Sequence, residues 1–223
     1  MRLLDTSTYK FHEYIGNNIP NYAILSHRWE KEEVSLRDLE DGQGFKMAGF
    51  AKIKGCCAQA ALGGFQYVWI DICCIDKTSS AELSEAINSM YLWYKNAQVC
   101  YAFLSDAVKE GKDTRHFSKS KWFTRGWTLQ ELLAPSYVVF YDRHWDEIGT
   151  KFSLETEISS ITDIRFSAQI NQACVAEKMS WASKRETTRV EDMAYCLMGC
   201  LACTWHRFIA RGITLSLGSS SKY

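Results

Sequence analysis

Residues 118–141 read SKSKWFTRGWTLQELLAPSYVVFY, and this stretch predicts a helix followed by a buried strand. The helix is expected over residues 127–133, because Pro135 lies just past its end and proline cannot continue a helix. The run 137–141 is continuously apolar and β-prone, as in a strand that is covered on both sides. A helix leading into such a strand is the repeating unit of α/β folds.

The predicted helix carries one acid, Glu131, and two interpretations of it stay open. Four residues share one face at helical spacing, namely Thr128, Leu129, Leu132 and Leu133. Trp127, Gln130 and Glu131 fall on the other face, where Trp127 and Glu131 are neighbours because they are four residues apart. An acid beside an indole fits a functional site. It equally fits a solvated glutamate with a tryptophan that leans on the core.

The same alternation of strand and helix extends backwards from this unit. Further strands are expected over 22–25, 67–72 and 99–104. Helices are expected over 45–62, ending at Gly63-Gly64, and after the capping-box pattern Ser79–Glu82, with Leu83, Ile87, Met90 and Tyr94 on one face. The order across 22–141 predicts an α/β domain with a mostly parallel central sheet, helices on both faces and right-handed crossovers. The polar segment 105–120 is long enough to be a mobile or functional loop.

After Asp142 the pattern becomes mainly helical. Loops are expected at 143–145 and 149–151, and helices over 153–161, over 171–180 and from the capping box Thr188–Glu191 through Met198. The sequence thus predicts a core unit at 22–141 and a helical extension at 142–199 that packs on one side or edge of the sheet. We expect the last ten residues of the Ser-rich end to be poorly ordered.

Composition excludes several classes of protein. The 223 residues are 47% hydrophobic and 23% charged, and 26 Lys and Arg balance 26 Asp and Glu, which argues against a nucleic-acid or acidic-membrane partner. No stretch approaches the ~20 apolar residues of a membrane span, and the N-terminus lacks the apolar segment of a signal peptide. We therefore expect a cytoplasmic protein without a membrane partner.

Nine cysteines are present, but their spacing is not that of a metal site. Cys56-Cys57 and Cys73-Cys74 are adjacent pairs, and the others are scattered. Zinc sites need CxxC-type spacing, so we expect buried thiols in a reducing compartment and no metal site.

Polar side chains follow two of the predicted strands where ligands bind in open α/β sheets. Ser26, His27, Arg28 and Trp29 follow the strand 22–25 directly, and Asp76 and Lys77 follow the strand 67–72. Asp71 interrupts that second apolar run, and a buried carboxylate needs a hydrogen-bonded partner. A strand cap with a solvated loop is the alternative for the first cluster, and a structural bond to a loop is the alternative for Asp71.

Three blocks in this order resemble the fungal heterokaryon-incompatibility (HET) domain. They are YAILSHRW at 22–29, YVWIDICCIDK at 67–77 and WFTRGWTLQELLAP at 122–135. The opening MRLLDTST and the segment MSWASKRETTRVEDMAYCLMG also fit, so the resemblance covers residues 1–199. Residues 200–223 depart from the family pattern. We expect this divergent tail to be disordered.

The resemblance implies a death-inducing effector of fungal non-self recognition with a three-layer fold like that of TIR domains and flavodoxin. In NAD-cleaving TIR domains, which HET domains distantly resemble, a glutamate four residues after a tryptophan is catalytic. This makes Glu131 the catalytic candidate, with Trp127 preferred over Trp122 as its partner. The residues considered for substrate binding are Ser26, His27, Arg28, Trp29, Asp71, Asp76, Lys77, Trp122, Arg125 and Trp127.

Two functions remain open at this point. One is cleavage of NAD, in which NAD is substrate and no cofactor is needed: Glu131 would stabilise a ribosyl cation, Trp127 or Trp29 would stack on a ring, and Arg28 would meet a phosphate. No GxGxxG or GxxxxGK[ST] motif supports the usual dinucleotide or P-loop sites.

The other function is a non-catalytic signalling module that acts by homotypic assembly, with a second copy or an upstream nucleotide-binding receptor domain as partner. A truncated, inactive relative is a further alternative, and a hydrolase using Cys73 or Cys74 with His27 has no recognisable motif. The enzyme hypothesis requires that Glu131 face a cleft shared with residues 26–29.

Overall fold

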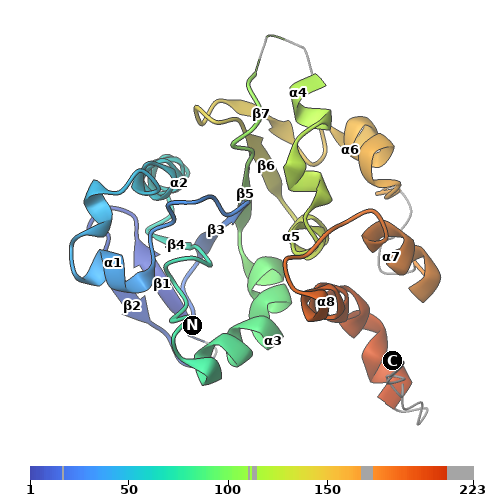
Figure 1. Cartoon of the computed structure of the whole chain (residues 1–223), viewed down its shortest axis with the longest axis horizontal. Helices are drawn as coiled ribbons and strands as arrows, with labels where there is room; N and C mark the ends of the chain where they lie inside the picture. Colours follow the sequence, from blue (N-terminus) through green and yellow to red (C-terminus); the bar gives the residue numbers. More distant parts are fainter. Residues whose placement is uncertain (17, 110, 112–114, 167–172, 210–223) are drawn as a thin grey trace, which may run out of the picture.

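The computed structural model describes the chain apart from residues 17, 110, 112–114, 167–172 and 210–223, and of residues 190 and 202–209 only the backbone. Among the described residues, seven strands form one sheet in the order β2-β1-β4-β3-β5-β6-β7 (Figure 1). The strands are β1 (Arg2–Asp5), β2 (Phe11–Glu13), β3 (Tyr22–His27), β4 (Tyr67–Trp69), β5 (Val99–Phe103), β6 (Val138–Tyr141) and β7 (Glu147–Thr150).

Helices connect and flank these strands. They are α1 (Leu36–Glu40), α2 (Phe50–Leu62), α3 (Ser80–Asn96), α4 (Arg115–Ser118), α5 (Thr128–Leu133), α6 (Glu155–Thr162), α7 (Val175–Ala182) and α8 (Val190–Ile209). Two 3₁₀ turns precede α2 and α5, namely η1 (Gly44–Lys46) and η2 (Lys121–Thr124). The α/β class expected from the sequence is confirmed.

The sheet is mixed, so the expectation of a mostly parallel sheet holds only for its centre. The four strands expected from the sequence, β4, β3, β5 and β6, are parallel to one another. The edge strands β1, β2 and β7 pair antiparallel. The turn at 142–146 between β6 and β7 is too short for a crossover, so it forms a hairpin, which is antiparallel.

Helices cover both faces of the sheet. The Tyr101 hydroxyl lies 3.4 Å from the carbonyl of Gln59 in α2, whereas the adjacent Cys100 Sγ lies 3.9 Å from the carbonyl of Glu131 in α5. Because successive residues of a strand point to opposite faces, α2 lies on one face of the sheet and α5 on the other. Tyr94 of α3 donates to the Leu25 carbonyl at 2.9 Å, and α3 packs beside α5.

Helix α5 is buried all round, which excludes the alternative of a solvated Glu131 on its second face. Its residues Thr128 to Leu132 are all buried, and Glu131 is only 3% exposed. The sheet covers one side of α5, and α8 packs against the other. Sequence periodicity assumes one covered face, and the second cover comes from a helix some 60 residues further along the chain.

Several element boundaries differ from the sequence-based ones. Strand β3 continues to His27, whereas β4 ends at Trp69, so Asp71 does not interrupt a strand but lies in the turn after it. The amides of Cys73 and Cys74 donate to the Ile70 carbonyl and close that turn. The helix expected over 45–62 begins only at residue 50, and Gly64 follows it with a φ of 80°. Asp71 therefore belongs to the carboxyl-end loops.

The C-terminal part contains a strand as well as helices. Residues 147–150 form β7 instead of a loop, and α8 continues past Met198 to Ile209. Helices α6 and α7 lie close to their predicted ranges, although residues 171 and 172 are outside the described residues. The last ten residues, for which disorder was expected, are also outside the described part.

The segment 105–120, expected to be a loop, contains the short helix α4, and its residues 110 and 112–114 are not described. None of the helices in the described ranges is both long and apolar enough to cross a membrane.

The packing of α8 on α3 and α5 leaves no space at Gly199. A Cβ there would lie 2.7 Å from Gln130 Oε1 and 2.8 Å from Tyr91 Cβ. We expect Gly199→Ala to destabilise the fold by ~0.5–2 kcal/mol, because overpacking costs ~1–3 kcal/mol and alanine regains only ~0.5–1 kcal/mol in a helix. Denaturant unfolding measures this, with Glu85→Ala on the exposed side of α3 as control. Equal or higher stability of Gly199→Ala would contradict the close packing.

Candidate functional site

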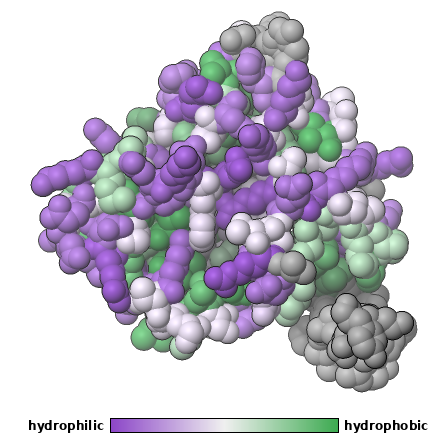
Figure 2. All heavy atoms as spheres, in the orientation of Figure 1, coloured by the Kyte–Doolittle hydropathy of each residue, from purple (hydrophilic) through white to green (hydrophobic). Residues whose placement is uncertain are grey.

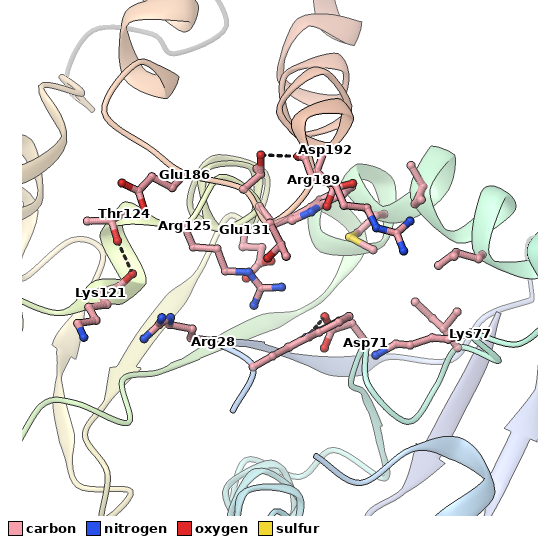
Figure 3. Close-up of a pocket in the computed structure, with 18 residues that line it drawn as sticks. Arg28, Asp71, Lys77, Lys121, Thr124, Arg125, Glu131, Glu186, Arg189 and Asp192 are labelled. Atoms are coloured by element: carbon pink, nitrogen blue, oxygen red, sulfur yellow. Dashed lines mark hydrogen bonds between the residues drawn. The ribbon is translucent and has the colours of Figure 1, made fainter. Parts of the chain in front are cut away.

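A cavity of about 690 Å³ lies at the carboxyl ends of the parallel strands, between the strand-end loops and helices α3, α5 and α8. Figure 3 shows charged side chains from several separate segments pointing into it. Its polar lining residues are Arg28, Asp71, Lys77, Lys121, Thr124, Arg125, Glu131, Glu186, Thr187, Thr188, Arg189 and Asp192. Trp29, Ile75, Leu83, Ile87, Met90 and Trp127 complete the lining.

Glu131 is held by a chain of buried hydrogen bonds. The Ser26 hydroxyl at the end of β3 donates to Glu131 Oε2 at 2.5 Å. Trp122 Nε1 in turn donates to Ser26 Oγ at 2.9 Å. All three residues are at most 3% exposed, and Trp122 packs against Phe123 and Phe140. The carboxyl group is therefore fixed relative to both the sheet and α5.

Burial dominates the chemistry of Glu131. It raises the pKa of Glu131 from 4.5 to about 7, because the charged form is poorly solvated. The positive charges of Arg125 and Arg185 and the Ser26 hydrogen bond oppose this rise in pKa, and the negative charge of Asp71 adds to it. A carboxyl group that titrates near neutrality in a cavity is suited to proton transfer or to stabilising a developing positive charge.

Trp29 joins the loops that follow β3 and β4. Its Nε1 donates to Asp71 Oδ2 at 2.8 Å. Lys77 Nζ lies 3.6 Å from the centre of the Trp29 ring, and Arg125 Cζ lies 5.3 Å from it. These cation–π contacts place two positive charges at the cavity. Trp29 therefore organises cations, and its ring is less available for stacking on a ligand than the sequence suggested.

His27 lies behind the cavity lining. It is 2% exposed, and its Nε2 lies 3.7 Å from Asp71 Oδ1 without a hydrogen bond. Its carbonyl accepts a hydrogen bond of 2.6 Å from Arg125 Nη1. Burial, followed by the charges of Lys52, Arg125 and Lys77, holds the pKa of His27 well below its usual value, so the imidazole is neutral at pH 7. The backbone of His27 thus orients Arg125.

The fold brings most of the predicted site residues together. Seven of them line the cavity: Arg28, Trp29, Asp71, Lys77, Arg125, Trp127 and Glu131. Ser26, His27 and Trp122 lie directly behind them. Asp76 is outside the lining, and its Oδ1 accepts hydrogen bonds from the amide and hydroxyl of Thr78, which gives it a role in the turn.

Both tryptophans named from the sequence lie close to Glu131, but in different ways. Trp122 reaches Glu131 through Ser26, whereas Trp127 lines the cavity and contributes its carbonyl to the Glu131 amide. The four-residue spacing that favoured Trp127 holds along an isolated helix. The link to Trp122 depends on the strand that runs beneath it.

Sequence reasoning missed the wall formed by the start of α8 and the residues before it. Arg185, Glu186 and Arg189 lie in the polar run before this helix, which was interpreted only as a capping box. A dense run of charged and hydroxyl residues at the start of a long helix was the available signal. Nothing in it indicated which other segment the run would face.

The face of the molecule in Figure 2 is mostly hydrophilic over the region between α3, α5 and α8. Within the described ranges, no group of three or more His, Cys, Asp or Glu side chains is placed to hold a metal ion. The cavity therefore combines cations, a buried acid and an apolar wall.

Comparison with known proteins identifies the family of this chain. The family model described as Heterokaryon incompatibility protein (HET) matches residues 22–115. The Vegetative incompatibility protein HET-E-1 of Podospora anserina is 46% identical over 197 residues, which are 82% of this chain and 14% of that protein. The chain belongs to the HET family, and it spans about one seventh of the length of this relative. No solved structure matches it.

The buried carboxyl should make stability depend on pH. The pKa of Glu131 is about 7 in the folded protein and near 4.5 when solvated, so its contribution to stability is full below pH 4.5 and is lost as the pH rises to 7. Glu131→Gln removes the ionisable group, so the variant does not lose this free energy of unfolding as the pH rises. We expect the variant to gain on the order of 2–3 kcal/mol relative to the wild type between pH 4.5 and 8.

Denaturant unfolding of both proteins across this pH range measures the difference, in which all other titrations cancel. Glu186→Gln, at an exposed position of the same cavity, is the matched control and should show no such trend. If the free energies of unfolding of Glu131→Gln and wild type differ by the same amount at every pH, Glu131 is ionised throughout the range.

Proposed function

We propose that this HET domain is a death-inducing effector of fungal incompatibility and that it acts by TIR-like cleavage of NAD in the cavity at Glu131. The observation that carries the enzymatic part is the buried carboxyl of Glu131, fixed by Ser26 and lining a cavity rich in cations. The part concerning incompatibility is supported by the relative, whose name is Vegetative incompatibility protein.

The strand order supports the TIR-like part of the proposal. The parallel strands follow the spatial order β4-β3-β5-β6, which corresponds to second, first, third and fourth along the chain. This is the order of a flavodoxin-like sheet, in which ligands bind outside the carboxyl ends of the strands, next to the point where the strand order reverses. That point lies beside β3, and Arg28 and Trp29, which follow β3, line the cavity.

In the proposed reaction, the bond between the ribose C1′ and the nicotinamide nitrogen breaks, and its electron pair leaves with nicotinamide. The resulting oxocarbenium centre is stabilised by the ionised carboxylate of Glu131, in a region where poor solvation strengthens the attraction. Water then adds to C1′ and releases a proton. The products are nicotinamide, ADP-ribose and one proton.

The cavity lining fits the other parts of NAD. Arg28 and Arg125 present guanidinium groups that suit the diphosphate, and Figure 3 shows Arg125 beside Glu131 and Arg28 further from it. Leu83, Ile87 and Met90 of α3 form an apolar wall against which an aromatic ring can lie. Trp127 remains the candidate for stacking, because Lys77 already lies over the Trp29 ring.

The test is release of nicotinamide from NAD by the purified domain, both in dilute solution and clustered on a scaffold. We expect Glu131→Gln to reduce turnover at least a hundredfold, since it removes the charge that stabilises the cation. The control Glu186→Gln, which changes another carboxylate of the cavity, should retain activity. Absence of turnover by folded, clustered wild type would rule out the enzymatic part, and turnover unaffected by Glu131→Gln would remove Glu131 from it.

The pH profile gives a separate prediction. The reactive form of Glu131 is the carboxylate, and its pKa is about 7. Turnover should therefore rise with pH up to about 7 and level off above it, falling to about a tenth of the plateau at one unit below the pKa. Initial rates from pH 5 to 9 measure this. A flat profile across neutrality would contradict the role of Glu131.

Non-catalytic signalling by self-association is the second candidate. The observation that favours it is a shallow groove between α3 and α8 with exposed apolar side chains at Leu92, Tyr195 and Met198. Sedimentation across a range of concentrations should then show self-association, and Met198→Asp should abolish it. A monomer at all concentrations would count against this function.

A further inference from the structure

Arg185 is a buried cation next to the site that does not line the cavity. It lies between α7 and α8 and is only 6% exposed. Its Nη1 donates to the Arg125 carbonyl at 3.0 Å and to Thr128 Oγ1 at 2.9 Å, and its Nε donates to the Trp181 carbonyl at 3.3 Å. Its Nη2 has no hydrogen-bond partner. A buried guanidinium that is bonded only to neutral acceptors lowers the stability of the fold unless a negative charge compensates it.

The contacts of Arg185 converge on the turn between η2 and α5. The Thr128 hydroxyl also lies 2.6 Å from the carbonyl of Trp122 and 2.8 Å from that of Arg125. Trp122 reaches Glu131 through Ser26, and Arg125 lines the cavity. Arg185 therefore contacts the turn that carries two groups of the site.

The backbone next to Arg185 reinforces this connection. The Glu186 amide donates to the Thr124 carbonyl, and the Gly126 amide donates to the Glu186 carbonyl, each at 2.7 Å. A Cβ at Gly126 would lie 2.4 Å from Thr187 Cγ2, so only glycine allows this approach. The segment that carries Arg185 is thus bonded along its length to the turn before α5.

Glu131 is the carboxylate that the charge of Arg185 affects. Arg185 opposes the rise in the pKa of Glu131. Burial lowers the pKa of Arg185 to about 10, and the negative charge of Glu131 opposes that fall. The other titratable groups facing Glu131 are Arg125, Asp71, Tyr94 of α3, Cys100 of β5 and Cys196 of α8. In the described part of the chain no direct ion pair joins Arg185 to Glu131, so the two interact through the poorly solvated interior.

We propose that Arg185 is a positioning residue of the site, which fixes the turn that carries Trp122 and Arg125 and places a buried positive charge in the same poorly solvated interior as Glu131. The contribution of Arg185 to catalysis rests on the proposed function. The effect of Arg185 on Glu131 is independent of that function, because it exists without substrate. The HET family model matches residues 22–115, so Glu131 and Arg185 lie outside the matched part.

The first measurement is the titration of Glu131 by infrared spectroscopy, with the wild type minus Glu131→Gln difference identifying its carboxyl band. Arg185→Met should raise the midpoint of this titration, because a positive charge that opposes the protonation of Glu131 is lost. Arg185→Lys keeps the charge and should leave the midpoint near that of the wild type. An unchanged midpoint in folded Arg185→Met overturns the proposal.

Lys178→Met is the matched control. Lys178 is also a buried cation of α7, 2% exposed, but its Nζ donates to the Cys200 carbonyl of α8 at 3.2 Å. Its loss should cost comparable stability and leave the titration of Glu131 unchanged. A shift equal to that of Arg185→Met would show a general effect of loosened packing and would overturn the proposal.

The second measurement is amide hydrogen exchange over residues 122–131, which tests positioning separately from charge. Arg185→Lys loses the planar fork and should exchange faster there, whereas Lys178→Met should not. If the amides of residues 122–131 are protected in Arg185→Lys as well as in the wild type, the positioning role is overturned. If Arg185→Met does not fold, the Arg185→Lys result alone decides the proposal. Both measurements are made without NAD, so their failure is distinguishable from a failure of the proposed function.

Discussion

A carboxyl group buried between the sheet and its helical cover is the constraint on which the rest of the site depends. Glu131 needs a hydrogen-bond donor, and Ser26 provides one from the end of β3. Trp122 then fixes the serine hydroxyl, and it can do so only because η2 and α5 lie directly over that strand end. The Trp122–Ser26–Glu131 chain thus links local chemistry to the order of strands and helices. Burying the carboxyl group of Glu131 lowers stability, and buried groups with shifted pKa values of this type are frequent at functional sites.

The C-terminal helices belong to this arrangement as much as the sheet does. Helix α8 covers the side of α5 that the sheet leaves open, and its first residues form a wall of the cavity. Arg185 and Glu186 connect this wall to the turn that carries Arg125. A site assembled from residues 26 to 192 depends on almost the whole described chain.

The charges of the cavity explain why an acid and several cations can lie together. Arg125 is oriented by the His27 carbonyl, and Lys77 by the Trp29 ring. Trp29 is in turn held by Asp71, so both of these cations have a fixed support. Preorganised charges of both signs around a poorly solvated carboxyl group can stabilise charge that develops in a reaction, because they need little rearrangement.

The sequence by itself determined the α/β class, the four parallel strands and the family, since buried strands are continuous apolar runs and the motifs stand at strand ends. It also named Asp71, because a carboxylate in a buried apolar run is unusual, and Glu131 and Arg125, because they stand in the block 122–135 that resembles the family. Only the tertiary structure decided that α5 is buried on both sides and that the side-chain hydrogen bonds of Glu131 lead through Ser26 to Trp122. It alone brought Arg185 to the turn before α5. Local periodicity reports one covered face, whereas these outcomes depend on contacts between segments that are far apart in the chain.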